Sequence, residues 1–290
     1  MEDLRRLLMS YAYNILGSWE DAKDIVQDVF LKFSQLDEDK IADRKSYLIR
    51  MVVNLAIDQK RRLKKERDNY PGHWLPEPIA TDDPNTAIDR KEILSYSMLV
   101  LLEKLDSKQR AVFILKEAFD YAHDEIASVL GITIESSRKI LSRAKSELRS
   151  QQYVAPDKSQ MKVLDQYLAV LESGDMGELE QLLTDEVTAT SDGGGKAPAF
   201  RHIITGARSV SALLAGLHKK TYTPVNVEIT RINHQPAIFY FFEGRIITCQ
   251  IFSVQNQHIE NIFFIRNPDK LKTLQKLYSE RVTISPRSSS

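Results

Sequence analysis

Residues 121–148 read YAHDEIASVLGITIESSRKILSRAKSEL, and this stretch decides how the N-terminal half of the chain folds. Ile126, Ala127 and Leu130 recur at helical spacing, and the repeat stops at Gly131, a residue suited to the left-handed conformation that closes a helix. Thr133 follows where the N-cap of a second helix is expected. Two helices joined by so short a turn predict a helix-turn-helix.

The second helix of this motif has an apolar face and a basic face. Its apolar stripe is formed by Ile140, Leu141, Ala144 and Leu148. We expect the opposite face to be exposed and to reach base edges and phosphates in a DNA major groove. The residues of that face are Ser136, Ser137, Arg138, Lys139, Ser142, Arg143 and Lys145. The alternative is a helical hairpin whose basic face is merely solvated.

A second basic segment occupies residues 46–67. Its first half is apolar at helical spacing and must be buried, whereas its second half is too charged to be buried. Asn54 interrupts the apolar run where a side-chain amide can receive a base. The side chains that would follow phosphates are Arg61, Arg62, Lys64, Lys65 and Arg67. A charge run alone usually marks a solvated face, but its combination with a helix-turn-helix favours DNA contact.

A third segment, Trp19 to Phe33, predicts an amphipathic helix with an acidic outer face. Ala22, Ile25, Val26 and Val29 share the inner face, and the outer face carries Asp24, Gln27, Asp28 and Lys32. Acidic side chains repel DNA phosphates. This face therefore suits a basic protein partner.

Several motifs occur together and in a fixed order. They are YNILGSWEDA at 13–22, DIVQDVF at 24–30, NLAID at 54–58, DEIA at 124–127 and LGI at 130–132. In combination they resemble the two conserved domains of the extracytoplasmic-function group of bacterial sigma factors. The resemblance covers about residues 1–150 and places sigma-70 region 2 at 1–67 and region 4, with the helix-turn-helix, at 88–152.

The resemblance implies a role for each surface. It places Asp24, Gln27, Asp28 and Phe30 against the clamp helices of the largest subunit of core RNA polymerase, and region 4 near the flap of the second largest. It assigns the promoter −10 element to Asn54, Arg61, Arg62 and Lys65, with Asn54 capturing a flipped base. The helix from Thr133 onward would read the −35 element. Core polymerase is then an obligate partner, because such factors bind promoter DNA poorly alone.

The segment 68–87 between these domains contains four prolines, which exclude a continuous helix. We expect a stiff linker that is mostly solvated, except that Trp74 is large and apolar and should pack against something. The run Trp74, Leu75, Pro76, Glu77, Pro78 also resembles a linker signature of the subgroup whose C-terminal extension is related to SnoaL, within the nuclear-transport-factor-2-like fold.

Two further motifs of that subgroup are present. They are Asp192, Gly193, Gly194, Gly195, Lys196 and Asn267, Pro268, Asp269, Lys270, Leu271. The glycines allow a close approach of backbone, so we expect this loop to dock on the sigma domains or their linker and to act in regulation. The alternative is that both motifs are ordinary folding features.

The C-terminal half has helices first and strands after. Helices are predicted at 161–172, 176–183 and 206–219, and period-two strands at 225–229, 237–242, 245–254 and 258–265. The predicted fold class is therefore multidomain, with two all-α sigma domains followed by an α+β, cone-shaped SnoaL-like domain at 158–280. Residues 281–290 are expected to form a disordered tail.

An enzyme in this half would need an acid or a base held in a cavity. The candidates are His202, His218, His234, His258, Asp192 and Tyr240, and none forms a recognisable pair. Lys196 is followed by Ala-Pro, so the glycine triplet is not a phosphate-binding loop. We therefore predict no catalysis and no cofactor, and leave open a small-molecule ligand in a C-terminal pocket.

Composition sets the remaining limits. Forty basic and forty acidic residues cancel over 290 residues, so the charge must be zoned and the polymerase must supply much of the DNA affinity. The single cysteine, Cys249, allows neither an internal disulfide nor a cysteine-based metal site. No stretch approaches the roughly 20 apolar residues of a membrane span, and no signal sequence is recognised, so we expect a cytoplasmic protein.

Two interpretations remain. One is a sigma factor regulated in cis by its C-terminal domain, with no need for a separate anti-sigma factor. The other is a ligand-responsive transcription regulator that binds DNA on its own, with the C-terminal fold as its sensor. The acidic surface of residues 24–33 discriminates between them, because a free-standing regulator has no use for it.

Overall fold

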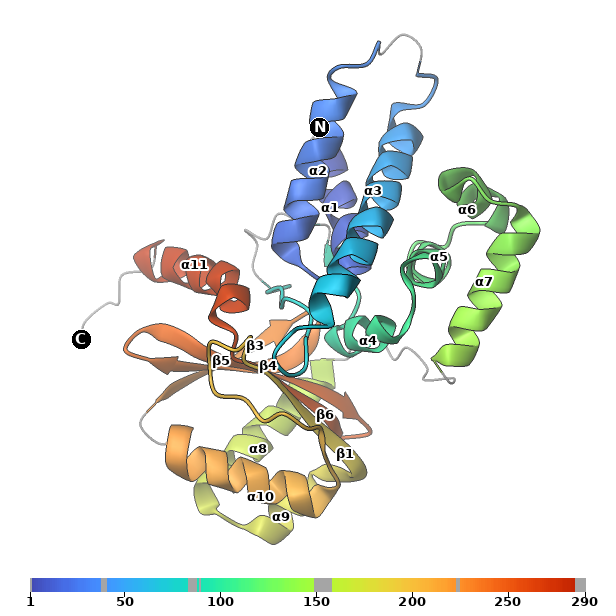
Figure 1. The fold of residues 1–290 in the computed structure, drawn as a ribbon. Coiled ribbons are helices and arrows are strands. Elements are labelled where there is room, and N and C mark those ends of the chain that lie inside the picture. The colour runs from blue at the N-terminus through green and yellow to red at the C-terminus, as the bar shows by residue number, and fades with distance from the viewer. Residues whose placement is uncertain are drawn as a thin grey trace. The chain divides into compact units, whose positions relative to one another are not determined.

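The computed structural model describes residues 2–37, 41–82, 88, 90–148, 158–222 and 225–284. Contacts divide the chain into two compact units. Unit 1 contains Met1–Asn69, Ala87–Leu94 and Met98–Val154, and unit 2 contains Tyr70–Thr86, Ser95–Ser97 and Ala155–Ser290. Figure 1 shows helices alone in the first and a sheet with helices in the second.

Unit 1 is helical. Its first elements are α1 (Glu2–Leu16), α2 (Trp19–Phe33) and α3 (Arg44–Arg67). They are followed by short 3-10 turns at Arg90–Glu92 and Leu102–Lys104, and by α4 (Tyr96–Leu101), α5 (Ser107–Glu117), α6 (His123–Leu130) and α7 (Ile134–Glu147). The first two residues of α4 are grouped with unit 2. The predicted helix-turn-helix and the two predicted upstream helices are confirmed.

Local capping explains where several of these helices begin and end. Ser18 and Asp43 cap α2 and α3 through their side chains, and the side chain of Thr133 accepts a hydrogen bond from the backbone of Ser136 at the start of α7. Gly131 closes α6 at φ 64° and ψ 40°, in the left-handed conformation that its position predicts.

Unit 2 is built around one sheet. Its helices are α8 (Lys162–Ser173), α9 (Met176–Gln181), α10 (Ala207–Leu217) and α11 (Pro268–Ile284), with a 3-10 turn at Lys158–Met161 and a π-helical turn at His218–Tyr222. Its strands are β1 (Leu183–Asp192), β2 (Ile204–Thr205), β3 (Asn226–Ile232), β4 (Gln235–Phe242), β5 (Arg245–Gln255) and β6 (His258–Ile265).

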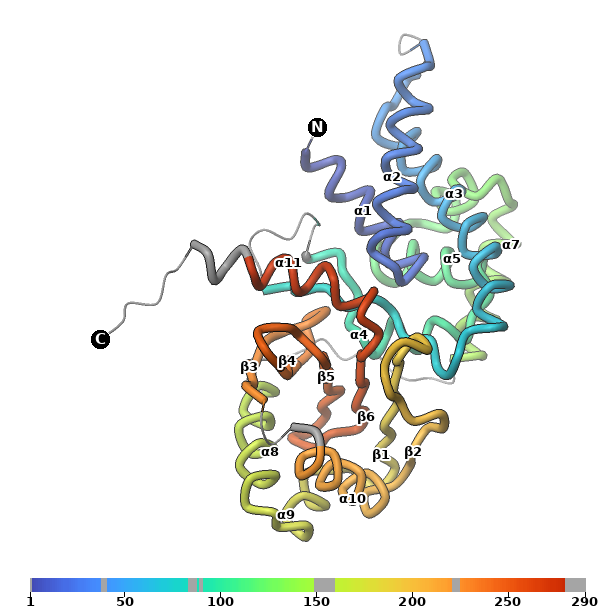
Figure 2. Tube along the Cα trace, turned by 60° about the vertical axis from the view of Figure 1, so that its left-hand side comes forward, coloured from blue at the N-terminus to red at the C-terminus, as the bar shows by residue number. Residues whose placement is uncertain are grey.

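The strand order in this sheet is β2-β1-β6-β5-β4-β3, with only the β1–β6 pair parallel. The predicted antiparallel meander is β3 to β6, and the predicted α+β class is confirmed. Helices α8, α9 and α10 lie on one side of the sheet and α11 lies on the other (Figures 1 and 2). The apolar core between the sheet and α8–α10 includes Val163, Tyr167, Val210, Phe252 and Phe264.

The linker segment belongs to unit 2. Residues 75–81 are buried, so the expectation that most of the linker is solvated is wrong for this part. Ile79 exchanges hydrogen bonds with Asn233, through the side chain in one direction at 3.0 Å and through the backbone in the other at 2.9 Å. Ala80 pairs with Ile232 in an antiparallel bridge. The buried linker thus continues the hydrogen bonding of the sheet beside the β3–β4 turn.

Helix α11 continues into the segment that was predicted to be a tail. It runs to Ile284, past residue 281, where a disordered tail was expected to begin. Residues 285–290 lie outside the described residues. Among the described helices, none combines the length and apolar character that a membrane crossing requires.

Candidate nucleic-acid interface

Helix α7 presents the basic face that the sequence predicts. Arg138, Lys139, Ser142, Arg143 and Lys145 are exposed, and Ser136 is partly exposed. Two of the cations are engaged in exposed ion pairs, Lys139 with Glu135 at 2.6 Å and Lys145 with Glu117 at 2.8 Å. Such exposed ion pairs contribute little to stability, so both lysines can leave their carboxylate partners and bind phosphates instead.

Ser137 is the exception on this helix. The prediction that its side chain is exposed is wrong, because it is fully buried under α6. Its Oγ lies 2.9 Å from Nδ1 of His123, at the start of α6. The hydroxyl therefore fastens the two helices together and is not available to DNA.

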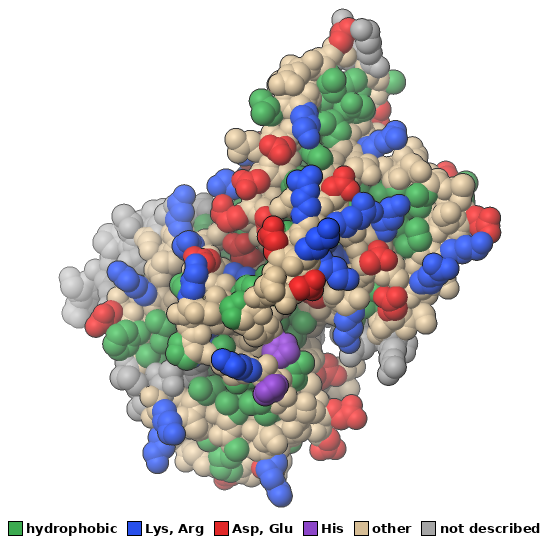
Figure 3. Space-filling view, viewed as in Figure 1, with side chains coloured by type: hydrophobic (Ala, Val, Ile, Leu, Met, Phe, Trp, Pro, Cys, Tyr) green, Lys and Arg blue, Asp and Glu red, His purple; other side chains and the backbone are tan. Residues whose placement is uncertain are grey.

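The second basic surface lies on α3. Arg61, Arg62, Lys64 and Lys65 are exposed, as predicted for side chains that follow phosphates, and Arg61 pairs with Asp58 at 3.1 Å. Figure 3 shows basic side chains gathered over this helix. Arg67 differs, because it points to Glu103 at 2.7 Å and is mostly buried. Its charge serves the packing of unit 1.

Asn54 lies on α3 and is half-buried. Its amide nitrogen donates to the carbonyl of Arg50 at 2.8 Å and to that of Val129, on α6, at 2.9 Å. The residue predicted to capture a base therefore faces the helix-turn-helix of the same chain.

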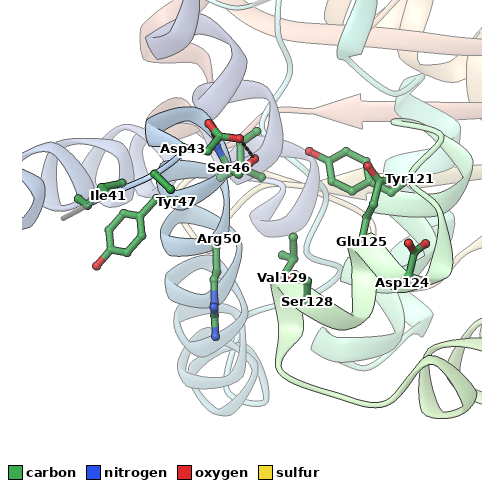
Figure 4. A pocket seen from close by; sticks show the side chains of 12 residues that line it. Ile41, Asp43, Ser46, Tyr47, Arg50, Tyr121, Asp124, Glu125, Ser128 and Val129 are labelled. Atoms are coloured by element: carbon green, nitrogen blue, oxygen red, sulfur yellow. Dashed lines mark hydrogen bonds between the residues drawn. The ribbon is translucent and has the colours of Figure 1, made fainter. Parts of the chain in front are cut away.

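A cleft of about 540 Å³ opens between the start of α3 and helix α6 (Figure 4). Ser46, Tyr47 and Arg50 line one wall, and Asp124, Glu125 and Ser128 line the other. Figure 4 shows Arg50 and Ser128 projecting from the two facing helices. The α6 wall is acidic, so a nucleic-acid phosphate would be repelled there.

The outer face of α2 carries the predicted protein-binding residues. Asp24, Gln27 and Asp28 are exposed, and Phe30 is partly exposed. Leu31 continues the same helical stripe and is 60% exposed, which the sequence reading missed. The sequence did contain a signal for this, because Leu31 follows Asp24 by seven residues and therefore lies on the same face of the helix. An exposed leucine in a row of acidic and amide side chains suits a protein partner.

The three predicted regulatory motifs meet within unit 2. The buried carboxylate of Asp192 accepts hydrogen bonds from the hydroxyl of Tyr70 at 2.6 Å and the backbone N–H of Leu75 at 2.9 Å. Lys270 forms an ion pair with Asp192 and also donates to the carbonyl of Leu75. The Lys270 ammonium lies 4.2 Å from the centre of the Trp74 ring. This cation–π contact agrees with the prediction that the large ring of Trp74 packs against another group.

The glycine loop is shaped by close approaches. A Cβ added to Gly194 would lie 2.2 Å from the side chain of Asn267, and one added to Gly195 would lie 2.8 Å from the ring of Pro71 in the linker. Both glycines also have positive φ. The predicted docking of this loop on the linker is therefore observed, whereas Lys196 pairs at the surface with Asp269.

The candidate catalytic residues do not converge. Tyr240 donates to Gln250 at 2.7 Å, and Gln250 donates to Tyr167 at 3.0 Å, inside the core. Asp192 is used by the linker. His202 and His258 are exposed, and His218 and His234 are partly exposed. Over the described part of the chain, no three His, Cys, Asp or Glu side chains are grouped as metal ligands would be.

Comparison with known proteins places these surfaces in a family. The model for Sigma-70 region 2 matches residues 1–66, and the model for Sigma-70, region 4 matches residues 96–148. The ECF RNA polymerase sigma factor SigJ of Mycobacterium tuberculosis is 34% identical over 223 residues, which are 74% of this chain and 71% of SigJ. The chain belongs to the extracytoplasmic-function (ECF) group of RNA polymerase sigma factors.

This sigma factor also resembles SigJ in three dimensions. The crystal structure of SigJ matches with a TM-score of 0.76 and 29% identity, over 93% of this chain and 96% of that chain. The match extends through the C-terminal domain, so this chain and SigJ share the α+β fold of that domain. The ECF sigma factor SigG of the same species is 26% identical over 270 residues, or 81% of this chain and 70% of SigG.

Proposed function

We propose that this sigma factor directs core RNA polymerase to specific promoters and starts transcription there. The observation that carries the proposal is that α3 and α7, from two different sigma-70 regions, each present an exposed row of basic side chains. Two separate DNA-binding surfaces that contact one duplex can select for the spacing between two promoter elements. Asn54, Arg61, Arg62 and Lys65 are assigned to the −10 element, and the exposed residues of α7 to the −35 element.

The polymerase side of the proposal rests on α2. Asp24, Gln27, Asp28 and Leu31 lie along one exposed stripe, with Phe30 beside it. A stripe of this chemistry fits basic and apolar side chains on clamp helices of the largest polymerase subunit. It is also the feature that a free-standing DNA-binding regulator would not need, and nothing in the family comparisons favours that alternative.

The C-terminal domain is proposed to regulate initiation within the same chain. Asp192, Lys270 and Gly195 hold the linker that connects the two DNA-binding regions. A linker held in this way limits how those regions can be spaced on a promoter. We propose that binding and release of the linker replaces a separate anti-sigma factor.

The remaining assignments follow from this role. Membership of a family of initiation factors supports a non-enzymatic protein that acts in the cytoplasm with the polymerase. A ligand in the C-terminal domain is retained only as a candidate signal, because Tyr167, Gln250 and Tyr240 already satisfy one another inside the core.

The test is transcription in vitro with core polymerase over a pool of promoter sequences. The full chain, a version ending after Pro268 and a version ending near Tyr153 are compared. We expect core-dependent, promoter-specific transcripts whose yield differs among the three. Absence of any core-dependent transcript, with the protein retaining DNA from the pool unaided, would instead establish a free-standing regulator.

Variants of α7 test the −35 assignment in the same assay. Arg138→Ala and Arg143→Ala should each weaken promoter recognition by about 1–3 kcal/mol if the side chain makes a bidentate base contact. Ser137→Ala is the matched control on the same helix, because its buried hydroxyl cannot touch DNA. We expect it to alter stability more than promoter choice. Unchanged promoter recognition after both arginine changes would contradict the assignment.

A further inference from the structure

Helix α4, with which the match to region 4 begins, starts inside the C-terminal unit. Residues 95–97 are grouped with unit 2, and the helix continues into unit 1 from Met98. Tyr96 is fully buried, and the centre of its ring lies 5.4 Å from that of Phe263 on β6. A residue of region 4 is therefore packed into the core of the C-terminal domain.

The turn between β3 and β4 supplies a hydrogen-bond acceptor for the start of this helix. The buried side chain of Gln235 accepts from the backbone N–H of Ser97 at 2.7 Å. The first N–H groups of a helix have no partner within the helix, so an acceptor held at this point fixes the end of the helix. The start of α4 is thus attached to the sheet of the C-terminal domain.

The same turn also holds the end of the linker. Ile79 exchanges two hydrogen bonds with Asn233, as described above. The backbone N–H of His234 donates to the hydroxyl of Thr81 at 2.9 Å. Asn233 and His234 both have left-handed backbone, with φ of 48° and 65°, as a tight two-residue hairpin turn requires. The hairpin therefore fixes the shape of the turn and the place of both attachments.

A further contact joins the two attached segments directly. The hydroxyl of Tyr96 donates to the carbonyl of Pro76 in the linker at 2.6 Å. Between Thr81 and Ser97 lie 15 residues, and a free chain of that length can span roughly 50 Å. Because one turn holds both Thr81 and Ser97, that reach is not available to region 4.

We infer that the β3–β4 turn is a tether that sets the reach of region 4 from the linker, with Gln235 and Tyr96 as its positioning residues. With the tether closed, the two DNA-binding surfaces accept a narrow range of spacings between the −10 and −35 elements. With the tether open, they accept a wider range. The tether is separate from the attachment of Leu75 to Asp192 and Lys270. The inference rests on the proposed function, because it concerns the same two promoter elements.

The test is transcription in vitro by the full chain with core polymerase, on promoters selected from the pool and varied in the spacer between the two elements. Spacers differ by single base pairs, and each step moves the −35 element by about 3.4 Å along the duplex. Gln235→Met and Tyr96→Phe are combined in one variant. This variant lacks the two side-chain hydrogen bonds that hold the start of α4.

The matched control makes the same two chemical changes elsewhere in the C-terminal domain. It combines Gln275→Met, which removes another side-chain acceptor of a backbone N–H at 2.7 Å, with Tyr240→Phe. The hydroxyl of Tyr240 is also buried and also donates one hydrogen bond, within the core. Neither control residue contacts α4 through the hydrogen bond that it loses.

Two measurements report the state of the tether. Hydrogen exchange of the Ser97 amide should quicken by about tenfold or more in the tether variant, because two hydrogen bonds no longer oppose opening. It should keep the wild-type rate in the control. Transcription from spacers one base pair longer and shorter than the best one should rise severalfold, relative to the best one, in the tether variant alone.

A faster Ser97 amide with an unchanged spacer profile would overturn the inference and leave the proposed function standing. Exchange of the Ser97 amide at the wild-type rate in the tether variant, or an equally broadened profile in the control, would overturn it as well. If the tether variant does not fold, Tyr96→Phe alone is compared with Tyr240→Phe alone. No core-dependent transcript from the wild-type chain at any spacing would remove the proposed function, and the inference with it.

Discussion

Glu103 joins three basic side chains inside unit 1. Its carboxylate contacts Lys60 at 2.8 Å, Arg67 at 2.7 Å and Arg110, and the side chain is only 22% exposed. Three cations around one carboxylate remain tolerable because carbonyls of α1 also accept from them: that of Leu16 from Lys60 and Arg67, and that of Asn14 from Arg110.

Replacing Glu103 by Gln should therefore destabilise unit 1 strongly. The change leaves buried cations without their counter-charge, which costs about 3–5 kcal/mol. Glu135→Gln is the matched control, because its exposed i,i+4 pair with Lys139 is worth about 0.5 kcal/mol. Chemical denaturation measures the free energy of unfolding of each variant. Hydrogen exchange of the amides of α3 and α5 measures the local stability of these helices in each variant. Equal losses from the two variants would contradict the central role of Glu103.

The lowered pKa of Glu103 predicts that unit 1 loses stability at acid pH. Burial alone would raise the pKa of Glu103, but Arg110, Lys60 and Arg67 outweigh it and lower the pKa from 4.5 to about 2. A lowered pKa means that the stabilisation is complete above the unfolded value and disappears as the pH falls from about 4.5 toward 2. The Gln variant should lack this part of the pH profile. If the Gln variant loses the same stability over this pH range, the loss would be due to other carboxyl groups.

At the scale of elements, the turn of the helix-turn-helix depends on Gly131. Its φ of +64° is left-handed, and an added Cβ would meet no atom within 4 Å, so any cost of Gly131→Ala is conformational. We expect a loss of about 1 kcal/mol. Gly216 in α10 is also open to a Cβ but has an ordinary helical backbone, so Gly216→Ala should stabilise by about 0.5–1 kcal/mol. Exchange rates of the amides of α6 and α10 should shift in opposite directions.

Elements with strong local patterns were predictable, and those defined by distant partners were not. Helices α2, α3, α6 and α7 follow from apolar spacing and caps, as does the antiparallel meander. Strand β1 was missed because only three of its side chains, Leu183, Val187 and Ala189, join the apolar core, and because its parallel partner β6 is remote in sequence. Burial of the linker was missed for a related reason, since Ile79 is satisfied by Asn233.

The site residues divide along the same line. Exposed charges such as Arg143 and Lys65 were found from the polar face of a helix, which a sequence reveals directly. Ser137 was assigned to the wrong environment because its burial depends on His123, which belongs to another helix. The contact of Asn54 with Val129 was likewise invisible, because it joins two regions that the sequence separates by a linker.

At the scale of the whole chain, the proposed regulation in cis would act through a buried ion pair that ties the linker to the C-terminal domain. Asp192 is fully buried, and the side chain of Lys270 is 11% exposed. Lys270→Met removes the charge, leaves Asp192 buried without its cation and frees the carbonyl of Leu75. The local cost should be about 3–5 kcal/mol. Lys196→Met is the matched control, because Lys196 pairs with Asp269 at the surface, where both side chains are more than a third exposed.

Limited proteolysis near Trp74, and its emission measured against a Trp74→Phe variant, report whether the linker is released. We expect faster cleavage and red-shifted emission for Lys270→Met, and wild-type behaviour for Lys196→Met. A chain ending after Pro268 also lacks Lys270, so the transcription yield of Lys270→Met should move from that of the full chain toward that of the shortened one. A released linker with an unchanged yield would separate linker binding from regulation, and an unreleased linker would show that the ion pair does not hold it.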